Sequence, residues 1–194
     1  KKLKLKQMAE EIYGKRAKLA GIDFYYNPIS EDPVLDWHCD TSYSGKKIVE
    51  KFVHPKDYLI KFFFYLSDVS KDNGCLSYIP GSNRITHALK KGIFEGDIQY
   101  TPYWSLKDFR KTIQIKNNYN YIKKIVDEDS LIKFLKLTNF VEGKDSKNYS
   151  FDNEVKKGGA VIFDETGIHR GSRIRYNARI AMRFFYKQLN DKKS

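Results

Sequence analysis

Cysteine is scarce in this sequence, and long apolar runs are missing from it. The two cysteines, Cys39 and Cys75, form no CxxC motif and no dense pattern. This excludes a disulfide-stapled secreted fold and makes a reducing, cytoplasmic setting the expectation. The run LIKFFFYL is far too short to cross a bilayer and no signal-peptide layout is present, so we expect no membrane partner.

Acidic residues are also in deficit. The chain has 24 Asp and Glu against 36 Lys and Arg, a formal net charge of +12. A positive surface field favours anionic partners, so we expect a small-molecule substrate of anionic character. Because the lysines are spread along the chain, with the densest runs at its two ends, we do not expect nucleic acid as a partner. The sequence sets no expectation for the oligomeric state.

The residues that are present predict one folded domain over 1–194. Hydrophobic content of 41% and aromatic content of 15% suit a globular core. Residues 1–20 have helix-forming residues at mixed three- and four-residue spacing, which predicts a helix that Gly21 ends. Short β-rich runs follow: IDFYYN, LDWHCDTSY, DYLIKFFFYLSDV and CLSYIP. Asn73-Gly74, between the last two runs, predicts a hairpin.

A long polar insert at about 84–157 separates these strands from a second β-rich region. It predicts helices around WSLKDFRKTI and DSLIKFLKL, after which Gly158-Gly159 forms a turn into AVIFD and later strands. With no βαβ rhythm, the order predicts a mainly β fold with added helices, as an antiparallel double sheet or jelly roll. Because long connections are often lids, our hypothesis is that the insert covers the functional site and selects the substrate. The alternative is a packing elaboration outside the barrel.

Three polar residues stand out in the β regions. In a strand, His38 and Asp40 of DWHCDTSY share one face while Cys39 points to the other. Polar groups on a buried face need a metal ion, a hydrogen-bond network or water. If the two halves of the sheet pack together, His169 joins them, and two imidazoles with one carboxylate form the facial triad of non-haem Fe(II) oxygenases. We interpret the other two histidines, His54 and His87, as loop residues.

An arginine in the last β-rich run extends this group. Alternation in ARIAMRFFY places Arg179, Ala181 and Arg183 on one face. An inward guanidinium beside a metal needs an anion, and its planar fork matches a carboxylate such as the far end of 2-oxoglutarate. Arg183 shares the face and stays open as the alternative anchor.

Three segments together resemble the phytanoyl-CoA dioxygenase family of Fe(II)/2-oxoglutarate oxygenases. They are WHCDTSY, DNGCLSYIPGSNR, and GGAVIFDETGIHRGS followed by NARIAMRFFY, within about residues 25–84 and 158–187. The resemblance implies a double-stranded β-helix, with Fe(II) bound by His38, Asp40 and His169 and with Arg179 as the 2-oxoglutarate anchor. It further implies O₂ as co-substrate, a C–H bond as target, and succinate and CO₂ as products.

The match to the family pattern has one point in favour of hydroxylation and two departures. Relatives that halogenate have a small residue at the position of Asp40, so its presence favours a hydroxylase. The segment RGSRIRYNA is crowded with cations where the family usually has an Asn, and no role is carried over to Asn177. Family members also normally have more chain before the H-x-D segment.

Other functions use the same residues. A cupin-like binding module without turnover keeps the barrel but not the chemistry. A zinc or other divalent-metal hydrolase uses the same three ligands, although Arg179 argues against it. An oxygenase that acts on nucleic acid or another macromolecule is suggested by the net charge alone.

Overall fold

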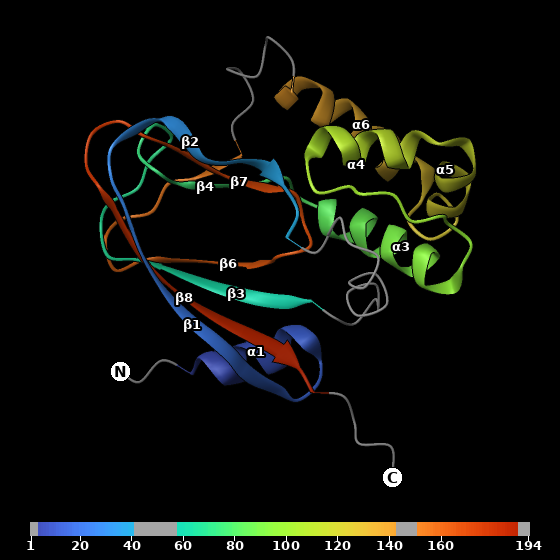
Figure 1. Ribbon diagram of the computed structural model, residues 1–194. Coiled ribbons are helices and arrows are strands. Elements are labelled where there is room, and N and C mark those ends of the chain that lie inside the picture. The colour runs from blue at the N-terminus through green and yellow to red at the C-terminus, as the bar shows by residue number, and fades with distance from the viewer. Residues whose placement is uncertain (1–3, 41–57, 143–150, 190–194) are drawn as a thin grey trace.

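The computed structural model describes residues 4–40, 58–142 and 151–189. Within them, eight strands form two four-stranded antiparallel sheets that face each other (Figure 1). The first sheet has the order β1-β8-β3-β6, with β1 at Ala17–Asn27, β8 at Arg179–Gln188, β3 at Leu59–Tyr65 and β6 at Ala160–Asp164. The second has the order β2-β7-β4-β5, with β2 at Ser30–His38, β7 at His169–Ile174, β4 at Leu76–Tyr78 and β5 at Asp152–Asn153.

This topology confirms the expected jelly roll of double-stranded β-helix type. Most successive strands along the chain lie in opposite sheets, so each sheet combines early and late segments. The inner faces carry the apolar residues of the alternating strands, such as Phe63, Tyr65, Phe163 and Ala181, which pack into one core cluster. Apolar side chains therefore line part of the space between the sheets.

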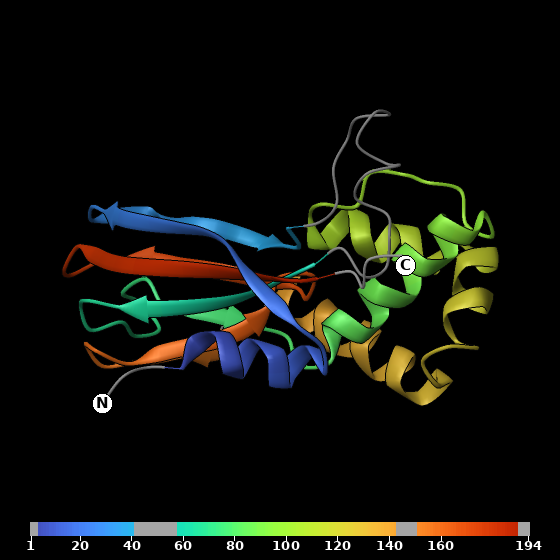
Figure 2. The same ribbon diagram turned by 90° about the horizontal axis from the view of Figure 1, so that it is seen from below.

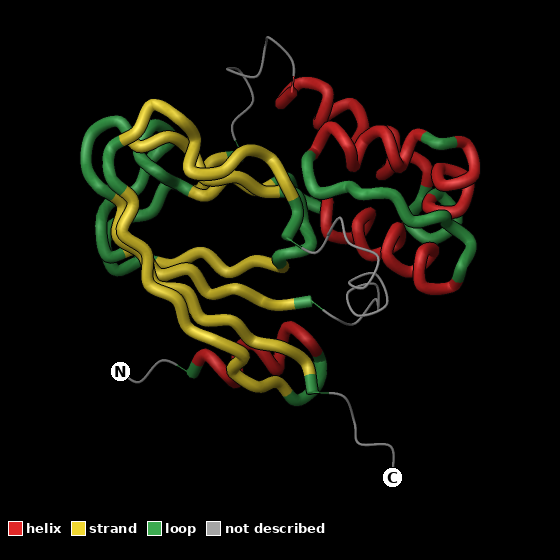
Figure 3. Tube along the Cα trace, viewed as in Figure 1, coloured by secondary structure: helices red, strands yellow, loops and turns green. Residues whose placement is uncertain are grey.

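Helices cover the outside and one end of this barrel. Helix α1, Leu5–Tyr13, packs on the outer face of the first sheet, against Ile60, Phe62 and Tyr186. Helices α3 (Ser82–Glu95), α4 (Leu106–Gln114), α5 (Lys116–Ile122) and α6 (Glu128–Glu142) gather at the end where β2 finishes (Figures 2 and 3). None of the helices in the described part of the chain has the length and apolar character needed to span a membrane.

Two expectations, the end of the first helix and the hairpin at Asn73-Gly74, are wrong. The first helix ends at Tyr13, because Gly14 adopts the left-handed conformation (φ 63°) and caps it. Gly21 lies within β1, beside a register shift, and does not end a helix. Asn73-Gly74 does not form a hairpin either, since β3 and β4 belong to different sheets. Gly74 (φ 76°) instead turns the chain from one sheet to the other.

The insert is more structured than the sequence indicated. Helices α4 and α6 confirm the two expected helical stretches, but α3, α5 and the short strand β5 were not expected. His87 lies in α3, so its interpretation as a loop residue is wrong. The other histidine interpreted as a loop residue, His54, lies outside the described residues. So does the part of the expected strand LDWHCDTSY beyond Asp40.

Candidate metal centre and cavity

His38, Asp40 and His169 come together at one end of the barrel. His38 is the last residue of β2, Asp40 lies in the turn directly after it, and His169 begins β7. The two histidines are register partners on neighbouring strands, and their ring centroids lie 4.3 Å apart. Asp40 Oδ1 is 3.2 Å from His38 Nε2, and Asp40 Oδ2 is 3.5 Å from His169 Nε2. One ligand atom from each residue therefore lies within 4.8 Å of the others.

Both imidazole rings are held by backbone carbonyls on the side away from Asp40. His38 Nδ1 lies 2.6 Å from the carbonyl of Asp36, and His169 Nδ1 lies 2.8 Å from the carbonyl of Gly167. A carbonyl accepts a proton, so each neutral ring carries its proton on Nδ1 and presents the Nε2 lone pair to the centre. This is the support that metal-ligating histidines receive in metalloproteins.

Electrostatics favour, for His169 and Asp40, the protonation states that metal ligands need. Burial lowers the pKa of His169, which favours the neutral imidazole. Burial opposes ionisation of Asp40, but the hydrogen bonds that His169 and His38 donate when they are protonated on Nε2, together with the charge of Lys61, hold the pKa of its carboxyl well below its usual range. Two neutral imidazoles and one carboxylate fit an Fe(II) ion of the facial-triad type.

Cys39 is directed away from this centre, as expected. Its side chain is fully buried in the core formed with the helices, and its Sγ lies 3.6 Å from the carbonyl of Tyr103. The two polar neighbours of Cys39 in sequence line the cavity instead.

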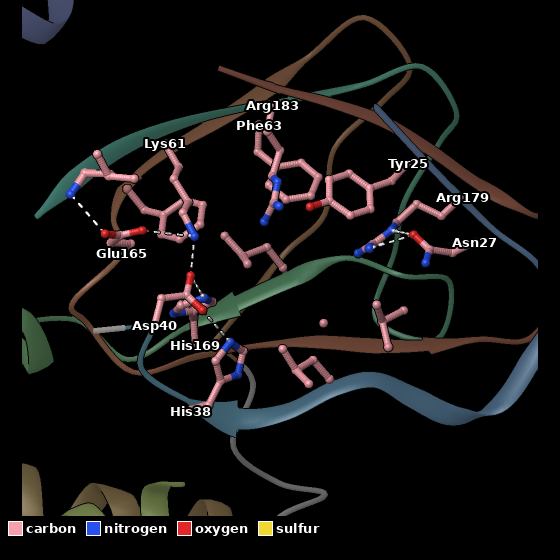
Figure 4. A pocket seen from close by; sticks show the side chains of 16 residues that line it. Tyr25, Asn27, His38, Asp40, Lys61, Phe63, Glu165, His169, Arg179 and Arg183 are labelled. Atoms are coloured by element: carbon pink, nitrogen blue, oxygen red, sulfur yellow. Dashed lines mark hydrogen bonds and ion pairs between the residues drawn. The ribbon is translucent and has the colours of Figure 1, made fainter. Parts of the chain in front are cut away.

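Lys61 and Glu165 adjoin the metal centre and were missed by the sequence reasoning. Lys61 forms an ion pair with Asp40 Oδ2, and its Nζ lies 3.2 Å from Glu165 Oε2 (Figure 4). Burial raises the pKa of Glu165, while the two carboxylates raise the pKa of Lys61 against the effect of burial. The available signal was a lone lysine in the apolar run LIKFFFYL, on the same strand face as Phe63 and Tyr65.

A cavity of about 570 Å³ extends from the metal centre between the two sheets. Arg179 lines it from β8 and is buried, which lowers the pKa of its guanidinium. Its Nε and Nη2 donate to Asn27 Oδ1 at 3.1 and 2.8 Å, and its Nη1 donates to the carbonyl of Gly74 at 3.0 Å. Asn27 is a second residue that no motif indicated.

The head of Arg179 reaches across the cavity to β7. A Cβ atom added to Gly171 would lie 3.4 Å from Arg179 Nη1 and 3.0 Å from Val34 Cβ. Gly171 is two residues along β7 from His169, a separation of about 7 Å in a strand. Arg179 therefore lies within the reach of a short dicarboxylate that extends from the metal centre.

The insert contacts the metal centre from outside the cavity. The Trp104 ring lies 5.1 Å from the His38 ring, and the Trp104 carbonyl accepts from the Cys39 amide at 3.1 Å. Among the residues that the structure describes, none from 84–157 lines the cavity itself. Whether the insert acts as a lid over the substrate stays a prediction.

Solved structures with the same fold include a non-haem alpha ketoglutarate dependent epimerase. EvdMO1 is 12% identical with a TM-score of 0.54, over 97% of this chain and 31% of that one. The epimerase SnoN, in complex with Fe³⁺, alpha ketoglutarate and nogalamycin RO, is 10% identical with a TM-score of 0.51, over 95% and 55%. EctD from S. alaskensis is 15% identical with a TM-score of 0.51, over 94% and 49%. This chain thus spans about a third to just over half of their lengths.

At these identities the likeness concerns the fold. No curated protein sequence matches the chain. The family model for phytanoyl-CoA dioxygenase (PhyH), however, matches residues 4–180, which include the metal centre and Arg179. This chain therefore belongs to the phytanoyl-CoA dioxygenase family.

Proposed function

We propose that the protein is a dioxygenase that uses Fe(II), 2-oxoglutarate and O₂ to hydroxylate a C–H bond of a small molecule. The observation that carries this proposal is the convergence of His38, Asp40 and His169 at one end of a cavity that also holds Arg179. Family membership supports it, as does the similarity to SnoN, whose structure holds Fe³⁺ and alpha ketoglutarate.

The three ligand residues would hold Fe(II). The two Nε2 atoms and the Asp40 carboxylate would be its protein ligands, and a set of three such ligands would leave positions for the co-substrate and O₂. When bound, Fe(II) and 2-oxoglutarate supply an oxidative decarboxylation by O₂ to succinate and CO₂, coupled to oxidation of the substrate. Asp40 fills the position that is a small residue in halogenating relatives, so the donor set supports hydroxylation.

Arg179 would position the far carboxylate of 2-oxoglutarate. Asn27 and the Gly74 carbonyl fix the guanidinium plane. Gly171 leaves the space that a side chain would fill between the metal centre and Arg179. Because Arg179 is 4% exposed, an ion pair at this point is screened little by water. The aromatic rings of Phe63 and Phe163 line the same cavity and exclude water from it.

An anaerobic titration with Fe(II) and then 2-oxoglutarate tests the proposal. The metal-chelated 2-oxo acid gives a weak visible charge-transfer band. We expect the band in the wild type and its loss in His38→Ala. In Arg179→Gln we expect the band at higher 2-oxoglutarate concentration, about tenfold or more, because a hydrogen-bonded ion pair is lost.

One matched variant controls for general effects. Arg175→Gln removes an exposed arginine from the connection between β7 and β8. It should keep the wild-type band and 2-oxoglutarate affinity. Absence of Fe(II) binding and of the band in the wild type would contradict the proposal and favour a binding module without turnover.

A further inference from the structure

Arg183 is a second arginine in the cavity, four residues after Arg179 on the same face of β8. Figure 4 shows its guanidinium between the metal ligands and Arg179, directed into the space between the sheets. It pairs with Asp23 on β1 and with Phe63 on β3, so it comes from the middle of the first sheet. A ligand that extends from the metal centre over the co-substrate would meet this group.

The hydrogen bonds of Arg183 are incomplete, unlike those of Arg179. Arg183 Nη2 donates to Asp23 Oδ2 at 2.8 Å. Arg183 Nε is buried and has no hydrogen-bond partner among the residues that the structure describes. A buried donor without an acceptor is costly, and native proteins normally satisfy such groups with the protein, water or a ligand. Arg179 already donates from Nε, Nη1 and Nη2.

Aromatic rings hold the Arg183 guanidinium in place. Its Cζ lies 4.2 Å from the ring centroid of Tyr25, 4.8 Å from that of Phe185 and 5.5 Å from that of Phe63. These contacts fix the guanidinium by stacking and cation–π attraction, and Arg183 remains among the residues that line the cavity. The side chain keeps 20% of its surface exposed, so a ligand in the cavity reaches it. The arginine is thus preorganised for an acceptor.

Its charge is also less neutralised than that of Lys61, another cation of the cavity. Lys61 lies between two carboxylates, those of Asp40 and Glu165. Within the described part of the chain, Arg183 has an ion pair with Asp23 alone. The Asp23 side chain is 45% exposed and also accepts from the Tyr25 hydroxyl at 3.0 Å. A pair with a solvated carboxylate is weak and leaves the cation attractive to a further anion.

We infer that Arg183 binds an oxyanion of the substrate, such as a carboxylate, sulfonate or phosphate, while Arg179 serves the co-substrate. This rests on the proposed function, because it assigns the metal centre and Arg179 to Fe(II) and 2-oxoglutarate. The substrate is then a small organic anion whose charged group is held at Arg183. Its reactive carbon lies toward the metal ligands, within a cavity in the size range of small-molecule sites.

The test uses the protein loaded anaerobically with Fe(II) and 2-oxoglutarate. The probes are straight-chain carboxylates, sulfonates and monoalkyl phosphates, each with an uncharged amide or alcohol of equal length, and binding is followed by the change in the charge-transfer band. We expect anions to bind and neutral analogues to bind at least about tenfold more weakly, since a charge-assisted hydrogen bond is absent. Arg183→Gln should abolish this preference with the dissociation constant of 2-oxoglutarate changed less than about twofold.

Two further variants keep the result interpretable. Asp23→Asn removes the competing carboxylate and should tighten anion binding, a gain that a misfolded variant would not give. Lys187→Gln removes a positive charge from an exposed position on the same strand and should change neither dissociation constant.

Equal anion binding by wild type and Arg183→Gln, or no anion binding to the wild type, overturns the inference. So does a loss of 2-oxoglutarate affinity in Arg183→Gln but not in Arg179→Gln. Failure of the proposed function differs from all of these, because the wild type then gives no band at all.

Discussion

Lys61 is a buried cation between the carboxylates of Asp40 and Glu165. Its removal tests how much the neutralisation of these negative charges contributes to stability. Lys61→Met leaves the buried carboxylate of Glu165 and the partly buried carboxylate of Asp40 without this counter-charge. We expect the free energy of unfolding of the metal-free protein to fall by about 3 to 5 kcal/mol, the cost of breaking a buried ion pair. Urea unfolding of the metal-free protein measures this change.

A divalent ion should restore more stability to this variant than to the wild type. Mn(II), which binds such ligands without oxidation, supplies the missing positive charge and stabilises the folded state by mass action. Lys156→Met is the matched control, because Lys156 is highly exposed and its pair with Asp68 lies on the surface. Equal losses in the two variants would contradict the expectation, as would equal stabilisation of Lys61→Met and wild type by Mn(II).

Functional residues could be predicted from the sequence where they belong to a motif with a characteristic spacing. His38, Asp40, His169 and Arg179 belong to segments with a recognisable pattern, and the structure brings all four to one cavity. Lys61 and Asn27 belong to no such segment. Their positions depend on cross-strand neighbours, Lys61 opposite Phe185 and Asn27 opposite Arg179, and such register is not readable from one strand alone.

At the scale of elements, hydrogen bonds connect α3 to Asp164, at the start of the turn that contains Glu165 and leads into His169. His87 Nε2 lies 2.9 Å from Asp164 Oδ2, to which Asn83 Nδ2 also donates at 3.3 Å. The amide and hydroxyl of Thr166 donate to Asp164 Oδ1 at 2.9 and 2.7 Å. Burial disfavours the charged carboxylate, but the bonds from His87 and Thr166 outweigh it and lower the pKa of Asp164.

This lowered pKa predicts a pH dependence of stability. A carboxyl whose pKa is lower in the folded state stabilises the fold above its unfolded pKa, about 3.9, and loses that contribution as the pH falls through the folded value. Asp164→Asn should therefore reduce the free energy of unfolding by about 2 kcal/mol at pH 7. The difference from wild type should stay constant down to about pH 5 and shrink below about pH 4.

Urea unfolding at a series of pH values measures this difference. Asp129→Asn, in the exposed first turn of α6, is the control and should track the wild type. A difference in unfolding free energy between Asp164→Asn and wild type that is independent of pH would contradict this prediction. It would show that the negative charge of Asp164 does not contribute to stability.

Elements were predicted best where their period was regular, and worst where a turn or cap decided them. The alternating runs of β3, β6 and β8 were identified, as were α4 and α6. Helix α3 was missed although Ile85, Leu89 and Ile93 recur at four-residue spacing and Gly96 ends it. Asn73-Gly74 has the composition of a hairpin turn, but a turn's composition does not say whether the chain returns to the same sheet.

At the scale of the whole molecule, the helices and the metal centre share one core. Cys39 and Ile168, each adjacent in sequence to a metal-centre residue, pack in the same buried cluster as Phe109 of α4 and Phe134 of α6. Backbone bonds reinforce this link, since the Cys39 amide donates to Trp104 and the Ile79 amide donates to Ile168. The end of the barrel is thus built jointly by strands and insert.

Phe109→Ala tests this joint construction. Phe109 is fully buried against the rings of Tyr103 and Phe134, so its truncation should cost about 3 to 5 kcal/mol in unfolding free energy. We also expect weaker Fe(II) binding, measured by titration of folded protein, because Cys39 and Ile168 lose their support. Phe94→Ala, at a half-exposed position of α3, should affect neither quantity strongly. A destabilised variant with unchanged Fe(II) affinity would favour the insert as a packing elaboration alone.

The architecture as a whole was predictable because the β runs on both sides of the insert required a shared core. The packing of the insert was not predictable, because its apolar residues face partners on β2 and on the segment before β7 that are distant in sequence. A single sequence gives the pattern of each helix but not the surface that it covers.

The direct pairing of His38 with His169 has a consequence for how the protein matures in the cell. The two imidazoles come from opposite ends of a long stretch of chain, and the ribosome releases the second long after the first. No partly synthesised chain that stops short of β7 has the complete ligand set, so these residues would bind iron together only after β7 has paired with β2. Non-local pairing of this kind also makes folding slow. Acquisition of iron by all three ligands would thus mark the pairing of the two strands.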